Sequence, residues 1–203
     1  MTCLSRILII GGYGRFGGQV AKLLADRADT TLLIAGRSLE KAAVFCADLK
    51  VAAQLVPMAF DREGDLLGQI SAAAPDLIID ASGPFQIYGR DPYRVVKAAL
   101  TCSICYIDLA DGADFVAGIT AFDDEAKARG IFILSGVSSY PALTAAAVDE
   151  LARDMVRIDG IWTGIAPSPR AGFGLNVVRA IASYAGKPIK IRHKGEIKVA
   201  HAL

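Results

Sequence analysis

The sequence has no excess of charge of either sign. Its 22 lysine and arginine residues nearly balance its 21 aspartate and glutamate residues, which leaves a net charge of +1. It also has no clustered basic stripe that would attract the phosphates of a nucleic acid or of an acidic membrane. We therefore expect no nucleic-acid partner, and we expect any anion to be bound by a local group of residues.

The sequence also lacks a long apolar run. Although 53% of the residues are hydrophobic, no stretch approaches the roughly 18 consecutive apolar residues of a membrane span. The short apolar run at residues 7–10 leads directly into a glycine-rich segment. This run is therefore predicted to be the first strand of a globular fold and not a signal peptide. The expected protein is cytoplasmic and makes no membrane contact.

Histidine and cysteine are scarce, with two and four residues respectively. Cys102 and Cys105 form a C-x-x-C pair, which a redox dithiol or half of a zinc site would also show. The two histidines, His193 and His201, lie far along the chain without metal-ligand spacing. We therefore predict no metal, and we interpret the two cysteines as small apolar side chains, with a dithiol as the alternative.

What the sequence does have is a glycine motif in a specific context. Gly12, Gly14 and Gly17 fit the pattern G-x-G-x-x-G directly after the apolar run, and a helical repeat beginning near Val20 follows. In this pattern the glycines permit a tight turn, a close approach to a pyrophosphate and close packing of helix on strand. The N-terminus of the following helix attracts the anion. The predicted cofactor contacts here are Gly12, Tyr13, Gly14, Arg15, Phe16 and Gly17.

Apolar runs and helical repeats alternate along the first 134 residues. This alternation is typical of a parallel sheet with helical crossovers, and it predicts an α/β, Rossmann-like, doubly wound sheet of about six strands over residues 1–141. The expected strands are residues 7–10, 31–36, 55–60, 77–80, 106–109 and 131–134. The expected helices are the one containing Val20, Leu23 and Leu24 and those at residues 38–49, 66–74, 92–100 and 122–129.

The rhythm changes after Tyr140-Pro141. Residues 142–203 predict the start of an α+β substrate or dimerisation domain, which we expect to be incomplete and which suggests a homodimer. Its expected elements are a helix at 143–155, a strand at 157–166, a helix at 175–185 and a pair of strands within 189–200.

The end of the second expected strand predicts which dinucleotide is bound. An NAD-preferring site usually has an acidic residue there, whereas this chain has Arg37-Ser38. The Arg37 guanidinium can pair with a 2′-phosphate, Ser38 can donate its hydroxyl, and Lys41 and Arg15 add positive charge. The pattern predicts NADP(H), although each basic residue has a solvated surface role as its alternative. Asp61, after the third strand, would accept from the adenine amino group or cap a helix.

Five segments in order resemble the saccharopine dehydrogenase-like oxidoreductases. They are GGYGRFG (11–17), AGRSLEK (35–41), SGPFQIYG (82–89), YIDLAD (106–111) and SGVSSYP (135–141). The resemblance covers nearly all of residues 5–145, and the chain is most similar to the bacterial branch of the family. It implies an NADP-dependent oxidoreductase that acts on a small molecule in a cleft closed by a second domain. By this resemblance Ser82, Gly83, Pro84 and Phe85 border the nicotinamide.

Candidate catalytic residues follow from position. Tyr88, Asp108 and Tyr140 lie at or beyond the carboxyl ends of expected strands, where open α/β sheets bind ligands. A turn hydrogen bond or a packed ring is the alternative role for Asp108 and Tyr88. Tyr93 and Lys97 also fit the Y-x-x-x-K of short-chain dehydrogenases, but they follow the fourth strand and not the fifth. Because no single acid or base stands out, a non-catalytic nucleotide sensor or scaffold is the alternative function.

Overall fold

The computed structural model describes residues 5–164, 175–193 and 195–201. The chain divides into two compact units, Met1–Ser138 and Ser139–Leu203. This division falls close to the expected change of architecture after residue 141.

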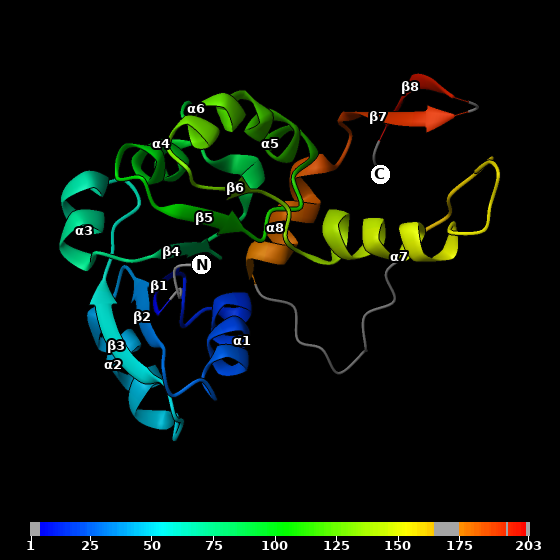
Figure 1. Cartoon of the computed structure of the whole chain (residues 1–203). Coiled ribbons are helices and arrows are strands. Elements are labelled where there is room, and N and C mark those ends of the chain that lie inside the picture. Colours follow the sequence, from blue (N-terminus) through cyan, green and yellow to red (C-terminus); the bar gives the residue numbers. More distant parts are fainter. Residues whose placement is uncertain (1–4, 165–174, 194, 202–203) are drawn as a thin grey trace. The chain divides into compact units, whose positions relative to one another are not determined.

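The first unit is built on a parallel sheet whose six strands lie in the order β3-β2-β1-β4-β5-β6 (Figure 1). This order confirms the Rossmann-like fold. The strand order reverses between β1 and β4, and ligands of such folds bind at the carboxyl ends of the strands beside this point. The strands are β1 (Arg6–Ile10), β2 (Thr31–Gly36), β3 (Gln54–Ala59), β4 (Leu77–Asp80), β5 (Cys105–Asp108) and β6 (Ile133–Leu134).

Helices cover both faces of this sheet because its central strands are apolar on both sides. Alternate residues of β1 separate into two cores: Ile7 and Ile9 pack with α1 and α2, whereas Leu8 and Ile10 pack with α3 and α4. The helices of this unit are α1 (Arg15–Leu24), α2 (Leu39–Asp48), α3 (Leu66–Ala73), α4 (Arg94–Thr101), α5 (Ala113–Gly118) and α6 (Asp123–Ala128), with short 3-10 helices η1 (Phe85–Ile87) and η2 (Ile119–Phe122).

Two parts of the first unit differ from expectation. Helix α5 was not predicted, because its six residues are too few to show a helical repeat. The last strand is also shorter than expected, since only Ile133 and Leu134 pair with β5. The other expected strands and helices of this unit are present with shifts of a few residues at their ends.

The second unit contains an antiparallel pair of strands, as the residues near 189–200 predicted. The expected strand at 157–166 is wrong: residues 157–164, its described part, form no regular element, and its last two residues lie outside the described ones. An apolar run becomes a strand only where a neighbour can bond to its backbone, and β7 and β8 pair with each other. The elements are a π-helical turn η3 (Ser139–Leu143), α7 (Thr144–Leu151), α8 (Leu175–Tyr184), β7 (Pro188–His193) and β8 (Glu196–His201).

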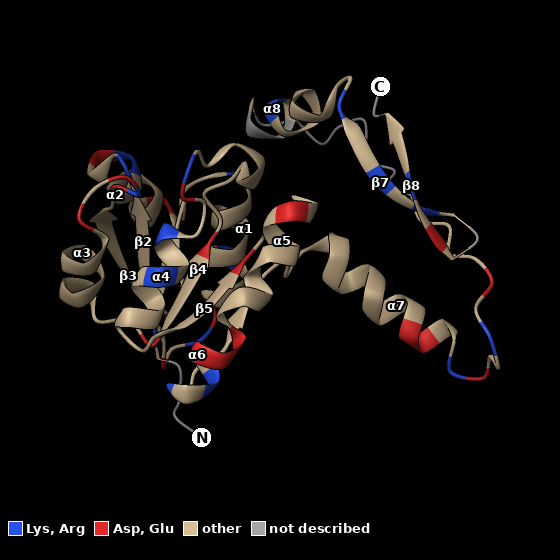
Figure 2. Cartoon of the chain, turned by 90° about the horizontal axis from the view of Figure 1, so that it is seen from above, with Lys and Arg blue, Asp and Glu red and all other residues tan. Residues whose placement is uncertain are grey.

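Lysine and arginine residues (blue) and aspartate and glutamate residues (red) are interspersed along the ribbon (Figure 2). Within the described residues, no helix is both long and apolar enough to cross a membrane.

Candidate functional site

The glycine loop connects the end of β1 to the start of α1. Gly14 is the N-cap of α1, and no side-chain cap hydrogen bond closes the first turn. Arg15 and Phe16 begin the helix and are both exposed. A helix N-terminus without a cap presents backbone N–H groups and a partial positive charge to an anion. This arrangement, at the carboxyl edge of the sheet, is suited to bind a phosphate group.

Gly17 explains why the third glycine of the motif is needed. A Cβ atom at this position would lie 2.2 Å from the carbonyl oxygen of Gly11. Helix α1 therefore packs against the loop at a distance that only glycine permits. The loop shape that the motif predicted is present.

Arg37 and Ser38 follow β2 at the same edge of the sheet. Arg37 and Lys41 are exposed, and within the described residues neither side chain has a hydrogen bond or ion pair. Ser38 is the N-cap of α2, where its Oγ accepts a hydrogen bond from the backbone N–H of Lys41 at 3.2 Å. An unpaired guanidinium beside a helix N-terminus is suited to bind a phosphate monoester.

Asp61 lies just past β3 and is exposed. Its Oδ1 accepts from the backbone N–H of Glu63 at 3.0 Å, and its own N–H donates to Gln69. The alternative that Asp61 caps a helix is wrong, because Asp65 is the N-cap of α3. Its predicted contact with adenine stays a prediction.

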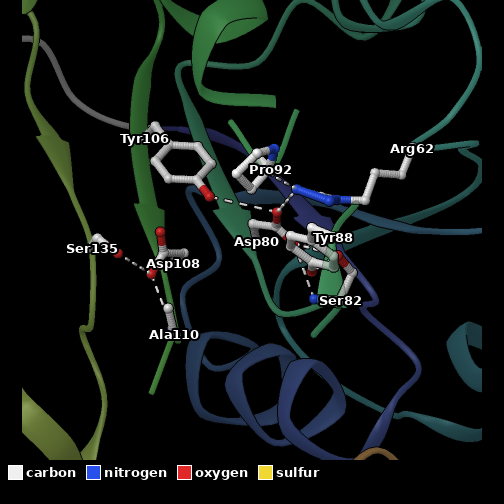
Figure 3. Close-up of polar contacts among 9 residues, drawn as sticks. All are labelled: Arg62, Asp80, Ser82, Tyr88, Pro92, Tyr106, Asp108, Ala110 and Ser135. Carbon is white, nitrogen blue, oxygen red and sulfur yellow. Dashed lines mark hydrogen bonds and ion pairs between the residues drawn. The ribbon is translucent and has the colours of Figure 1, made fainter. Parts of the chain in front are cut away.

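A buried polar network lies at the ends of β4 and β5, beside the point where the strand order reverses (Figure 3). Asp80, the last residue of β4, is fully buried and forms an ion pair with Arg62 at 3.5 Å. Ser82 donates its hydroxyl to Asp80 at 2.5 Å, and the hydroxyls of Ser82 and Tyr88 are 2.9 Å apart. Tyr106 also donates to Asp80, at 3.5 Å.

Sequence reasoning missed Asp80 and Arg62. The available signal was a carboxylate that ends an otherwise apolar, fully buried strand, because such a charge must be paired. The partner could not be found this way, since Arg62 follows a different strand. The Arg62 guanidinium also lies over the Tyr88 ring, 3.3 Å from its centroid, and this contact fixes the ring.

Tyr88 is held in this network as a protonated phenol. Burial, reinforced by the negative charge of Asp80, raises the pKa of Tyr88 far above its ordinary value. Its ring contacts Phe85, which is buried and also packs against Phe115. The Phe85 side chain therefore supports the loop from inside, while Gly83 and Pro84 are half-buried.

Asp108 forms hydrogen bonds with the segments that follow β5 and β6. It is fully buried, and its Oδ1 accepts from the N–H groups of Ala110 and Gly136 and from the Ser135 hydroxyl, each at 2.9 Å. Its Oδ2 has no hydrogen-bond partner among the residues that the structure describes. Burial raises the pKa of Asp108, although the three hydrogen bonds oppose that rise. These contacts match the turn role that was the alternative to catalysis, and the catalytic role stays a prediction.

The Y-x-x-x-K and C-x-x-C motifs lie outside this network. The Tyr93 hydroxyl donates to the carbonyl oxygen of Phe115 at 2.9 Å, and Lys97 pairs with Asp91 at 2.8 Å. This pair therefore has no short-chain dehydrogenase geometry. Cys102 and Cys105 are half-buried free thiols. Cys102 is the C-cap of α4 and Cys105 begins β5, so both lie at the edge of the sheet away from the glycine loop.

Tyr140 belongs to the second unit, where it is half-buried in η3. Its predicted catalytic role stays a prediction. Among the described residues, no group of histidine, cysteine, aspartate or glutamate side chains is arranged to hold a metal ion.

The strand order and the glycine loop between β1 and α1 are those of the Rossmann class of dinucleotide-binding proteins. Residues 7–135 match the saccharopine dehydrogenase NADP binding domain, and this chain belongs to that family. NADP(H) is accordingly its cofactor. The family and the fold together support an NAD(P)-dependent oxidoreductase in general terms.

Two solved structures are similar to this chain, and the first, at a TM-score of 0.50, has the same fold. A ketone-specific alcohol dehydrogenase from Comamonas testosteroni has 14% identity and a TM-score of 0.50, over 75% of this chain and 84% of its own. Biliverdin reductase from Synechocystis sp. PCC 6803, crystallised with biliverdin and NADP+, has 14% identity and a TM-score of 0.47, over 90% of this chain and 57% of its own. A comparison with curated protein sequences found no significant match.

Proposed function

We propose that this protein is an NADP(H)-dependent oxidoreductase of the saccharopine dehydrogenase-like type, which transfers hydride between the cofactor and a small substrate. The observation that carries this proposal is the pairing of two anion sites at one edge of the sheet. One is the uncapped N-terminus of α1, and the other is the unpaired Arg37 after β2. A dinucleotide with a 2′-phosphate needs a phosphate site of each kind.

In this proposal each group of residues binds a different part of the dinucleotide. The first turn of α1, from Gly14 to Gly17, binds the pyrophosphate. Arg37, Ser38 and Lys41 bind the 2′-phosphate, and Asp61 accepts from adenine. The loop of residues 82–85 borders the nicotinamide. When bound, the cofactor supplies or receives the hydride, and the protein must manage one proton.

The hydrogen bonds of Ser82 indicate how that proton would move. A serine hydroxyl has one hydrogen, and Ser82 donates it to Asp80. Tyr88 must therefore be the donor in its bond with Ser82. No described residue donates to the Tyr88 oxygen, so its lone pairs can accept. In the oxidising direction, a substrate proton would pass to Tyr88 Oη. At the same time the phenol proton would pass from Tyr88 to Ser82, and the hydroxyl proton of Ser82 would pass to Asp80. The same path in reverse would deliver a proton, without a free phenolate.

The remaining predicted residues take supporting roles in this proposal. Asp108 acts through the backbone N–H groups that it binds, as a positioning residue. The catalytic role predicted for Tyr140 also belongs to this proposal.

The test is a calorimetric titration of the whole chain with NADPH and, separately, with NADH. We expect at least a tenfold preference for NADPH, about 1.4 kcal/mol. Arg37→Ala should remove most of this preference. Arg27→Ala is the matched control, because Arg27 is an exposed arginine that pairs only with Asp29 at 3.8 Å. Equal losses for both dinucleotides in Arg37→Ala would show that Arg37 is not the 2′-phosphate ligand.

A nucleotide sensor or scaffold is the second candidate. It is supported by the hydrogen bonds of Ser82 to Asp80 and to Tyr88. A network with a purely structural role would have the same hydrogen bonds. Tight NADPH binding without NADPH oxidation by any aldehyde, ketone or imine in a panel would favour this candidate. Turnover that Tyr88→Phe abolishes, with NADPH binding unchanged, would favour the enzyme.

A further inference from the structure

Tyr13 connects the two anion sites. It lies within the glycine loop, yet its hydroxyl accepts a hydrogen bond from the backbone N–H of Ser38, 25 residues away, at 3.0 Å. The motif predicted Tyr13 only as one member of the pyrophosphate loop. Its described contact is instead with the segment that carries Arg37.

The Tyr13 ring fits against β2 because Gly36 has no side chain. A Cβ atom at Gly36 would lie 2.5 Å from Cε1 of Tyr13 and 2.7 Å from its hydroxyl oxygen. The ring is half-buried and packs with the core on that face of the sheet. The aromatic ring and the glycine are therefore complementary, and the ring holds the hydroxyl at the end of β2.

The backbone on both sides of Arg37 is fixed by hydrogen bonds. The Ala35 carbonyl accepts from the N–H groups of Gly11 and Gly12, at 2.8 and 3.0 Å. The Gly36 carbonyl accepts from the N–H of Phe60 at 2.9 Å. These bonds before Arg37 join backbone to backbone. After Arg37, the backbone N–H of Ser38 is bonded instead to a side chain, the Tyr13 hydroxyl.

We infer that Tyr13 is a specificity-determining positioning residue, which holds Arg37 and Ser38 in the geometry that binds a 2′-phosphate. This inference rests on the proposed role of Arg37. A guanidinium and a phosphate bind best when the backbone that carries the arginine is already ordered, because less conformational freedom is then lost on binding. Tyr13 would thus favour the phosphorylated dinucleotide without contacting its phosphate.

The test uses two fragments of the cofactor, adenosine 2′,5′-bisphosphate and adenosine 5′-monophosphate, which differ only in the 2′-phosphate. Tyr13→Phe keeps the ring on Gly36 and deletes the hydroxyl. One hydrogen bond of typical strength corresponds to about a fivefold change in affinity. We expect the variant to bind the bisphosphate about fivefold more weakly and the monophosphate with little change, as measured by calorimetry.

Two further variants separate positioning from general structure. In an Arg37→Ala background, Tyr13→Phe should alter the ratio of the two affinities much less than it does in the wild type, because the part of its effect that acts through Arg37 is then gone and only the part through Ser38 remains. Tyr93→Phe is the matched control, since it also removes one hydroxyl bonded to the backbone, to Phe115. It should leave the ratio unchanged even if it lowers the melting temperature.

Three results would overturn the inference. Equal weakening of both fragments by Tyr13→Phe would make Tyr13 a general support of the fold. Tighter binding of the bisphosphate would mean that the hydroxyl occupies the Ser38 N–H that the phosphate needs. A wild-type chain that binds neither fragment would instead overturn the cofactor site itself, and with it the proposed function.

Discussion

In the first unit, the side chains of Ile34 and Ile78 are completely buried. In the second unit, Ile181 and Ile197 are 68% and 65% exposed, and Trp162 is 91% exposed. The two units have similar kinds of apolar residue but different neighbours. A parallel sheet with helices on both faces buries two sets of side chains, whereas a two-stranded hairpin has no layer of its own to pack against.

The first unit has its own core and carries the described parts of the cofactor site. In the second unit, Leu151, Met155 and Trp162 line an apolar groove of about 280 Å³ beside α7. Exposed apolar surface of this kind marks contact regions. The homodimer that the sequence suggested through residues 142–203 stays a prediction.

We expect the largest difference in the free energy of unfolding when an isoleucine is replaced by alanine in each unit. Ile78→Ala should lower the free energy of unfolding by about 2–5 kcal/mol, because it leaves a cavity beside β1 and β5. Ile197→Ala should change it by less than about 0.5 kcal/mol. Urea denaturation followed by circular dichroism measures both. A large, concentration-dependent loss in Ile197→Ala would instead indicate that a second copy covers β8.

Asp108 should give the next largest effect. Asp108→Ala leaves three hydrogen-bond donors without their acceptor, which should cost about 3 kcal/mol in total. Asp108→Asn keeps an acceptor oxygen and should cost much less. If both variants lost the same stability, the carboxylate and not the acceptor geometry would be the important feature.

The same residue predicts a pH dependence. The raised pKa of Asp108 means that the folded chain holds this proton more tightly than the unfolded chain. The stabilisation is therefore complete below the ordinary aspartate pKa and is lost as the pH rises through the raised folded value. The stability of the wild type relative to Asp108→Asn should fall with pH over that window. A difference that rises with pH would contradict the burial argument.

Gly17→Ala should have an intermediate effect. The new Cβ would lie 2.2 Å from the Gly11 carbonyl oxygen, so α1 must move, at a cost of about 1–3 kcal/mol. NADPH binding should weaken as well, because the helix N-terminus moves. Gly130→Ala is a useful comparison, since a Cβ there has open space but the φ of +67° is strained. It should lower stability without weakening NADPH binding.

The smallest effect concerns Trp162, the single tryptophan of the chain. Because this indole is exposed in the second unit, its fluorescence reports on that unit. We expect little change in its emission at the urea concentration where the circular dichroism of the sheet is lost. A coincident, cooperative change in both signals would show that the two units unfold together.

Local pattern was sufficient for most of the first unit. The apolar runs of β1, β2 and β4 are continuous because these strands are buried on both faces, and the glycine loop has a fixed spacing. The strand expected at residues 157–166 was an error because local pattern says nothing about pairing. The described part of this run, residues 157–164, has no paired neighbour and forms no strand. Helix α5 was missed because six residues show no repeat.

The Rossmann-like fold, the glycine loop and the cofactor NADP(H) could be predicted from the amino-acid sequence, because each prediction used residues that are close in the chain or spaced by one β-α unit. The partners of Asp80 and Tyr13 could be found only in the folded chain. Arg62 reaches Asp80 from the end of another strand, and Tyr13 reaches Ser38 across 25 residues. Such contacts depend on which strands lie side by side, and strand order is a property of the folded sheet.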